Sequence, residues 1–306
     1  MTKDVNSLIE QINALDYFHS IDFGDWRTKS WVYPGNVPQN THLFSVFKLL
    51  QEIDVKNQYC LDMGTYDGLT AFILAELGAK VVATCQYDRK QFRYAHEYLC
   101  HRDQKFSSIR YIPGFHIEEV QNYNFDSKFD LIILSAALHH MLSPLVTLTT
   151  FRKLLKEGGL LILEVAFADG DQPTFSLNTE VEDPVEGIPT IFIPTRSAVE
   201  GSLKFCSFEI LGAAELDQLG KENINNYKRI AFVAKAVKPS SVSNRRPQLV
   251  TTHEKSPYFS HINFRELENN DEEVSNISYS GEKYTLIDIG DFETKLPLQP
   301  NINKTS

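Results

Sequence analysis

The chain has 306 residues, of which 42% are hydrophobic, and a formal net charge of −10 at pH 7. This composition supports a sizeable core and excludes a wholly disordered protein, and no apolar run reaches the length of a membrane span. The acidic balance disfavours tight binding of nucleic acid, whose affinity comes largely from basic groups that replace counterions, although it leaves room for a local basic patch.

The cysteines and the N-terminus bear on the cellular compartment. Cys60, Cys85, Cys100 and Cys206 are scattered, and no pair has the spacing of metal ligands. They are therefore interpreted as thiols in a reducing compartment. Because the first ten residues lack a basic and then apolar signal pattern, we expect a cytoplasmic protein.

The first 57 residues predict two helices and an aromatic segment between them. Apolar residues recur at helical spacing over 4–18 and again over 43–53. Residues 17–35 contain both tryptophans of the chain together with turn residues and other rings. Such a segment is expected either to form a lid over a binding site or to pack its rings against the core.

From residue 58 onward, strands and helices alternate, which predicts a parallel sheet covered by helices on both faces. The last two strands would pair antiparallel. We therefore expect an α/β, Rossmann-like fold with a seven-stranded sheet. The expected strands are 58–62, 80–84, 109–112, 129–134, 160–165, 208–211 and 229–236, and the expected helices are 68–77, 90–101, 144–155 and one near 195–204.

The C-terminal part has a different composition. Residues 238–244 form a linker by composition, and a short strand-like piece lies at 284–289 in an otherwise polar stretch. We expect an extension that wraps on the main domain or is partly disordered. The predicted organisation is an N-terminal helical and aromatic region (1–57), a ligand-binding domain (58–238) and a C-terminal extension (239–306).

The stretch from Tyr59 to Gly68 is the most informative part of the chain. A short apolar strand runs into Asp62-Met63-Gly64, and Gly68 opens the next helix. Glycines let the backbone approach a ligand, and the free amides of a helix N-terminus favour anionic groups. This arrangement predicts a site for a nucleotide-like ligand, although its spacing differs from the Gly-x-Gly-x-x-Gly dinucleotide fingerprint.

Asp-x-Gly-x-x-x-Gly at 62–68 resembles the first motif of the class I S-adenosylmethionine (SAM) methyltransferases. Residues 129–144, with His139-His140 and Pro144, resemble the fourth motif of the subgroup that carries Leu-Tyr-His-x-x-x-Pro. Together with Trp26-Arg27-Thr28 and Lys228-Arg229, these stretches resemble the CmoB-like group, bacterial enzymes that alkylate 5-hydroxyuridine at the tRNA wobble position. The resemblance covers about residues 17–237.

The resemblance implies SAM as the cofactor and a set of residues that bind it: Asp62, Gly64, Thr65, Tyr66, Gly68, Gln86, Asp88, Phe115 and Ser135. Two positions depart from the pattern of SAM enzymes. Cys85 stands where an acid usually binds the ribose, so Gln86 or Asp88 would substitute, and Phe115 offers a ring where an acid usually binds the adenine. Leu69 replaces the tyrosine that holds the extra carboxylate of carboxy-SAM, so plain SAM is expected even though Arg229 matches a basic partner.

Methyl transfer needs the two reactants in line and, for some acceptors, a base. His139 and His140 follow the fourth strand, where ligands bind in open α/β sheets, and His19 is a further candidate base. Alternatively, one of these histidines caps a strand end or binds the cofactor. The candidate substrate-binding residues are Tyr17, Trp26, Trp31, Tyr33, Arg196 and Arg229, with a surface ion pair as the alternative for Arg196. Glu164, Asp169 and Asp171 lack the spacing of a metal-dependent methyltransferase, so no metal is expected.

The sequence therefore predicts a SAM-dependent methyltransferase that acts on a small metabolite, in small-molecule biosynthesis. Two alternatives stay open: a tRNA wobble-uridine methyltransferase, and a methyltransferase fold that has lost catalysis and serves as a binding module. Neither a membrane partner nor a particular oligomeric state is predicted.

Overall fold

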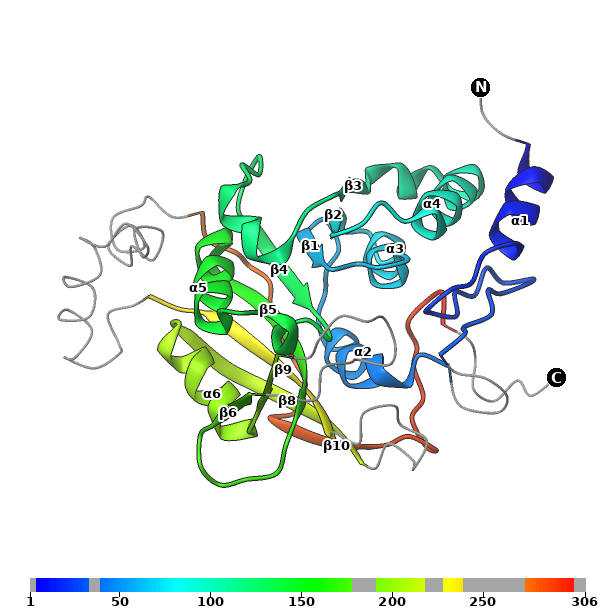
Figure 1. Ribbon diagram of the computed structural model, residues 1–306. Coiled ribbons are helices and arrows are strands. Elements are labelled where there is room, and N and C mark those ends of the chain that lie inside the picture. Colours follow the sequence, from blue (N-terminus) through cyan, green and yellow to red (C-terminus); the bar gives the residue numbers. More distant parts are fainter. Residues whose placement is uncertain (1–3, 33–38, 178–190, 218–227, 239–272, 300–306) are drawn as a thin grey trace.

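The computed structural model describes residues 4–32, 39–177, 191–217, 228–238 and 273–299. Within these residues the fold is built on one eight-stranded sheet in the order β10-β8-β9-β5-β4-β1-β2-β3 (Figure 1). Its strands are β1 (Tyr59–Met63), β2 (Lys80–Cys85), β3 (Arg110–Pro113), β4 (Phe129–Leu134), β5 (Leu155–Phe167), β8 (Phe208–Asp217), β9 (Lys228–Ala236) and β10 (Tyr284–Asp288). The strands β6 (Phe175–Leu177) and β7 (Phe192–Pro194) form a separate hairpin.

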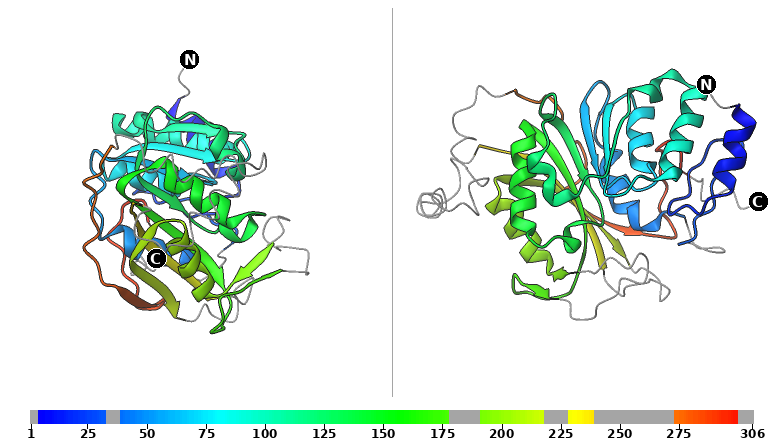
Figure 2. Two further views of the ribbon diagram at one scale, coloured as in Figure 1. Left: turned by 90° about the vertical axis from the view of Figure 1, so that its left-hand side faces the viewer. Right: turned by 45° about the horizontal axis from the view of Figure 1, so that its top comes forward.

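Helices cover both faces of the sheet (Figure 2). The helices are α1 (Val5–Asn13), α2 (Phe44–Leu50), α3 (Leu69–Glu76), α4 (Lys90–Arg102), α5 (Pro144–Leu154) and α6 (Arg196–Phe205), and the short 3₁₀ turns are η1 (Thr41–Leu43), η2 (Gln104–Ser108), η3 (Ile117–Asn122) and η4 (Leu138–His140). Alternate residues of β4 divide between the two cores, because successive side chains of a strand point to opposite faces. Leu131 and Ile133 pack with the α1–α4 side, whereas Ile132 and Leu134 pack with α5 and α6.

The predicted parallel sheet with a final antiparallel pair is confirmed, but the count of seven strands was wrong. β9 pairs antiparallel with both β5 and β8. The eighth strand is β10, which adds parallel to β8 and comes from the strand-like piece predicted at 284–289. A long-range pairing of this kind leaves no periodic signal in the sequence.

Several predicted boundaries also differ from the structure, among them the end of the strand expected at 208–211, which runs to Asp217. β5 begins at Leu155 rather than at residue 160, and its pairing with β4 shifts register near its start. The first helix ends at Asn13 rather than near residue 18. Beyond it the chain forms isolated bridges, Tyr17 with Ser30 and Asp22 with Arg27, which fold the aromatic segment back on itself.

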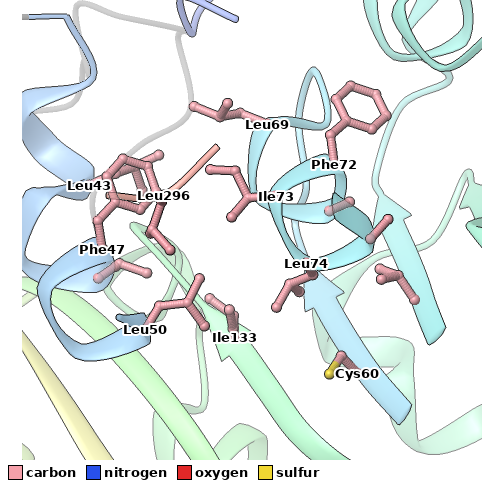
Figure 3. Packing of buried hydrophobic residues seen from close by; sticks show 14 of the residues in the cluster. Leu43, Phe47, Leu50, Cys60, Leu69, Phe72, Ile73, Leu74, Ile133 and Leu296 are labelled. Atoms are coloured by element: carbon pink, nitrogen blue, oxygen red, sulfur yellow. The ribbon is translucent and has the colours of Figure 1, made fainter. Parts of the chain in front are cut away.

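The core between α2 and α3 includes a side chain from the C-terminal segment (Figure 3). Leu43 and Phe47 lie near Leu296, and Ile73 of α3 faces them; all four side chains are buried. Seven of the eight residues of α3 are buried, because the helix packs on β1 and β2 and against η2.

Residues 273–299 run along the main domain and contact it repeatedly. Ser275 Oγ donates to Asp130 Oδ1 at 2.6 Å, and the peptide N–H of Asp22 donates to Leu298 O at 3.0 Å. The ring of Phe292 lies 4.6 Å from that of Phe44. The described part of the C-terminal extension therefore belongs to the same core as the sheet.

Candidate cofactor and active site

The carboxyl ends of the central strands meet at one edge of the sheet. Met63 of β1 pairs with both Thr84 of β2 and Leu134 of β4, and Leu134 pairs with Leu163 of β5. Residues that directly follow these positions are therefore brought together. Ligands bind at this edge in open α/β sheets. Arg229 of the antiparallel β9 reaches the same edge opposite Ala166.

The turn after β1, residues 64–68, has an unusual backbone. The amides of Gly64 and Thr65 both donate to Thr84 O, at 3.1 and 2.8 Å. Gly64, Tyr66 and Gly68 have φ values of +79°, +56° and +101°. Glycine adopts such values readily, whereas tyrosine does so at a cost. The turn is thus held in a shape that its sequence only partly favours.

Asp62 and Thr65 leave acceptor atoms available at this turn. Both side chains are buried, and neither Asp62 Oδ2 nor Thr65 Oγ1 has a hydrogen-bond partner among the described residues. Burial raises the pKa of Asp62 to about 6. The Thr65 side chain and the charge of His19 lower that pKa, but their effects are smaller. A buried acceptor without a donor is costly, so a cationic or hydrogen-bond-donating ligand group would be stabilised here. These residues fit the amino-acid end of SAM.

The residues predicted to bind the ribose are exposed, whereas the ring predicted to lie at the adenine is buried. Asp88 is exposed and forms an ion pair with Arg93 at 2.6 Å, and Gln86 is exposed. Cys85 is buried at the end of β2, and its carbonyl accepts the peptide N–H of Phe115 at 3.0 Å. The ring of Phe115 is buried and meets Tyr123 edge to face at 5.2 Å.

Glu164 forms the centre of a closed network at the end of β5. Arg229 donates to it twice, from Nε at 2.7 Å and from a terminal nitrogen at 2.9 Å. Ser135 Oγ and the peptide N–H of Ala136 donate to Oε2 at 2.9 and 2.8 Å. The predicted ligand residues Ser135 and Arg229 therefore both have a protein partner in this network, which was not foreseen.

His139 and His140 lie in η4, directly after β4, with ring centroids 4.2 Å apart. His139 is buried, and its Nδ1 has no hydrogen-bond partner among the described residues. Burial lowers the pKa of His139 well below its ordinary value, and the charges of His140 and Arg229 lower it further. His139 is thus a neutral imidazole at pH 7, able to accept a proton or a hydrogen bond.

His19 lies at the turn after β1 because it contacts Asp67. Its ring Nδ1 contacts Asp67 Oδ1, and its peptide N–H donates to Asp67 Oδ2 at 2.8 Å. The ring of His42 stacks on that of His19 at 5.2 Å. Burial, followed by the charges of His19 and Arg229, lowers the pKa of His42 well below its ordinary value. Asp67 and His42 were missed from the sequence, where only the position of Asp67 inside the glycine turn gave a signal.

The aromatic segment supplies Phe18 and His19 to the turn, whereas several of its other rings lie elsewhere. Tyr17 is buried and donates from its hydroxyl to Gln91 O at 3.1 Å. The indole of Trp26 donates to the Tyr98 hydroxyl at 3.2 Å, two turns along α4. Trp31 is 41% exposed, and its ring meets that of Phe18 edge on. Tyr33 lies outside the described residues.

Arg196 is the remaining residue predicted to bind the substrate, and the structure instead places it in ion pairs, which was the alternative expected for it. It forms ion pairs with Glu200 at 2.9 Å and Glu215 at 3.5 Å, and its guanidinium lies over the ring of Tyr284. Within the described ranges, no group of three His, Cys, Asp or Glu side chains is placed to hold a metal ion. None of the helices in those ranges is long and apolar enough to cross a bilayer.

Comparison with known families agrees with this geometry. Residues 37–198, just over half of the chain, match the family described as a methyltransferase domain. The fold and the site thus define a class I SAM-dependent methyltransferase, and the chain belongs to that family. The predictions of enzyme class and of SAM as the cofactor are confirmed, as is the resemblance to the CmoB-like group.

Among curated relatives, the tRNA U34 carboxymethyltransferase of Campylobacter hominis is 27% identical over 57% of this chain, and that of Psychromonas ingrahamii is 26% identical over 67%. The chain spans 60% of the length of each. The hybrid PKS-NRPS synthetase 1 of Dothistroma septosporum is 28% identical over 69% of this chain, which matches 5% of that protein. Among solved structures, the [4+2]-cyclase SpnF has a TM-score of 0.51 at 15% identity, covering 76% of this chain and 93% of its own.

Proposed function

We propose that the protein transfers the methyl group of SAM to a small-molecule acceptor. The observation that carries the proposal is the pair of buried acceptor atoms, Asp62 Oδ2 and Thr65 Oγ1, that have no partner among the described residues at a glycine-rich turn. These oxygens can accept hydrogen bonds from the ammonium group of an amino acid. The net charge of −10 favours a small acceptor over a polyanion.

The bound cofactor supplies a methyl group activated on a sulfonium. Asp62 would hold the ammonium, and the glycines at 64 and 68 let the turn adopt its left-handed backbone conformations. His139, neutral because of burial, accepts the proton that the acceptor loses as its bond to the methyl group forms. Burial above all, with His140 and Arg229 as smaller causes, keeps the pKa of His139 low and the ring neutral before the acceptor binds.

We infer that the cofactor is plain SAM rather than carboxy-SAM. Leu69, at the position where the resemblance implies a tyrosine, is fully buried at the start of α3. Arg229, the matching basic residue, is held in two hydrogen bonds by Glu164. A second carboxylate would have to compete with Glu164 for Arg229. Calorimetric titration with both compounds tests this, and tighter binding of carboxy-SAM would contradict it.

The proposed activity is tested in two steps. Calorimetry with S-adenosylhomocysteine should show binding to the wild type and at least about tenfold weaker binding to Asp62→Ala. The control is Asp126→Asn, which removes an exposed acid paired with Arg110 and should bind as the wild type does. No binding by the wild type would instead favour the non-catalytic binding module.

The acceptor is then sought with SAM that carries a labelled methyl group. The protein is incubated with separated small-molecule and tRNA fractions of a cell extract. Label in a small molecule, found by mass spectrometry, supports the proposal. Label in tRNA alone would replace it with the second candidate.

That second candidate is methylation of the tRNA wobble uridine. It is supported by the two relatives called tRNA U34 carboxymethyltransferase, at 27% and 26% identity. The acidic charge of the chain and the buried Leu69 weigh against it.

A further inference from the structure

The aromatic segment contacts the cofactor turn through two neighbouring residues. The ring of Phe18 lies 4.9 Å from that of Tyr66. His19 occupies both oxygens of Asp67, one with its ring and one with its peptide N–H. Asp67 is fully buried and His19 is 6% exposed. The turn is therefore attached to a segment that precedes it by 48 residues.

The turn needs such an attachment. Tyr66 has a φ of +56°, and a residue with a Cβ pays on the order of 1–2 kcal/mol for a left-handed conformation. Strained residues of this kind persist when their surroundings fix them. Here Phe18 packs against the Tyr66 ring, and the guanidinium carbon of Arg89 lies 4.0 Å from the centre of that ring.

The His19 side is itself held in place. The His42 ring stacks nearly parallel to the His19 ring, at an angle of 21°. The backbone of Ser20 exchanges two hydrogen bonds with the side chain of Asn40, at 2.9 and 2.8 Å. The Thr28 hydroxyl donates to His19 O at 3.1 Å. These contacts fix His19 before any ligand binds.

We propose that His19 is a positioning residue for the cofactor, which acts through Asp67 to hold residues 64–68 in their left-handed shape. This rests on the proposed function, since it takes the turn as the SAM site. The contacts of His19 with Asp67 use its Nδ1 and its peptide N–H, and the positioning role rests on these two contacts. Asp67 supports the turn from inside the protein, because its side chain is fully buried and each of its oxygens contacts His19.

The test is the dissociation constant of S-adenosylhomocysteine, measured by calorimetry for four proteins. His19→Ala should bind at least about tenfold more weakly than the wild type. His19→Asn, whose amide can donate to Asp67 from nearly the same place, should recover most of the affinity. Tyr98→Phe removes the hydrogen bond that Trp26 makes to α4, away from the turn, and should bind as the wild type does.

Thermal melting without ligand separates positioning from general loss of fold, since a merely structural residue would lower the melting temperature and leave affinity unchanged. Affinity of folded His19→Ala within about twofold of the wild type would overturn the proposal. If His19→Ala does not fold, the affinity and the melting temperature of Asp67→Asn are compared with those of the wild type instead. If the wild type itself does not bind, the proposed function fails. Hydrogen exchange of the amides of 64–68 then tests the positioning role separately. Faster exchange in His19→Ala than in the wild type supports that role, and equal exchange contradicts it.

Discussion

Gly68 shows how tightly single residues constrain the cofactor turn. Its φ is +101°, and a Cβ added there would lie 2.5 Å from Phe72 and 2.7 Å from Phe92. Both rings are fully buried. Neither the backbone nor the neighbouring side chains can accept a methyl group without moving.

We therefore predict that Gly68→Ala lowers the free energy of unfolding by about 2–4 kcal/mol, from backbone strain together with overpacking. Urea denaturation measures this. The matched control is Gly201→Ala in α6, where the added Cβ meets nothing within 4 Å. Because alanine is the better helix former, that variant should be more stable by about 0.5–1 kcal/mol. Equal effects at the two positions would contradict the account of the turn.

Asp62 makes stability depend on pH. Its pKa in the folded protein is about 6, above the ordinary value of 3.8. Between these values the folded protein binds more protons at this site than the unfolded chain does. Asp62 therefore costs stability as the pH rises through this window, by up to about 3 kcal/mol once the pH exceeds 6.

Asp62→Asn should therefore unfold at higher urea concentration than the wild type at pH 7.5, and the difference should shrink at pH 5. The control is Asp88→Asn, an exposed acid paired with Arg93, which should show no such gain. A pH-independent difference for Asp62→Asn would mean that the carboxyl is not the titrating group. Asparagine should also weaken cofactor binding, because stability and function conflict at this position.

Some residues of the candidate site could be expected from the sequence and others could not. Asp62, Gly64 and Gly68 form a local pattern, because strand, turn and helix follow one another directly. His139 was also accessible, since it follows an apolar strand. The pairing of His19 with Asp67 and that of Arg229 with Glu164 span 48 and 65 residues. Such partners depend on how the chain packs, and no local pattern specifies them.

At the scale of elements, some predicted boundaries match the structure closely. The expected strand at 129–134 matches β4, and the helix at 90–101 matches α4 to within one residue. β10 was anticipated only as a short strand-like piece, and its place at the edge beside β8 was not. Pairing partners follow from the whole topology, so single-element patterns cannot supply them.

The C-terminal segment gives an element-scale prediction. Leu296 is 8% exposed and packs in the core with Leu43 and Phe47 (Figure 3). Leu296→Ala should cost about 2–4 kcal/mol, from lost burial and the cavity left behind. Leu286→Ala on β10 is the control, since that side chain is 54% exposed and should change stability by less than about 0.5 kcal/mol. If both substitutions had similarly small effects on stability, residues 273–299 would be an appendage outside the core.

At the scale of the whole molecule, charge bears on the choice of acceptor. The chain carries 40 acidic and 30 basic side chains. Arg229 and Arg196, two of the basic residues considered for ligand binding, are paired with Glu164 and with Glu200. The long-range field of the molecule therefore repels a polyanion.

We predict that filter binding will detect no salt-sensitive, micromolar retention of tRNA. The measurement is made at two salt concentrations, because binding through phosphate contacts weakens steeply as salt rises. A basic protein of similar mass that retains tRNA serves as the positive control. Micromolar retention that falls strongly with salt would favour the wobble-uridine reaction over a small acceptor.

The contact between Asn40 and Gln299 has a consequence for how the protein is made. The two residues are 259 positions apart, and Asn40 also supports Ser20, next to His19. At roughly 5–20 residues per second on the ribosome, on the order of tens of seconds pass between the synthesis of Asn40 and that of Gln299. During this interval the apolar surface of α2 that Phe292 and Leu296 later cover is exposed on the nascent chain. The cofactor turn therefore gains its full support only after Gln299 has been synthesised.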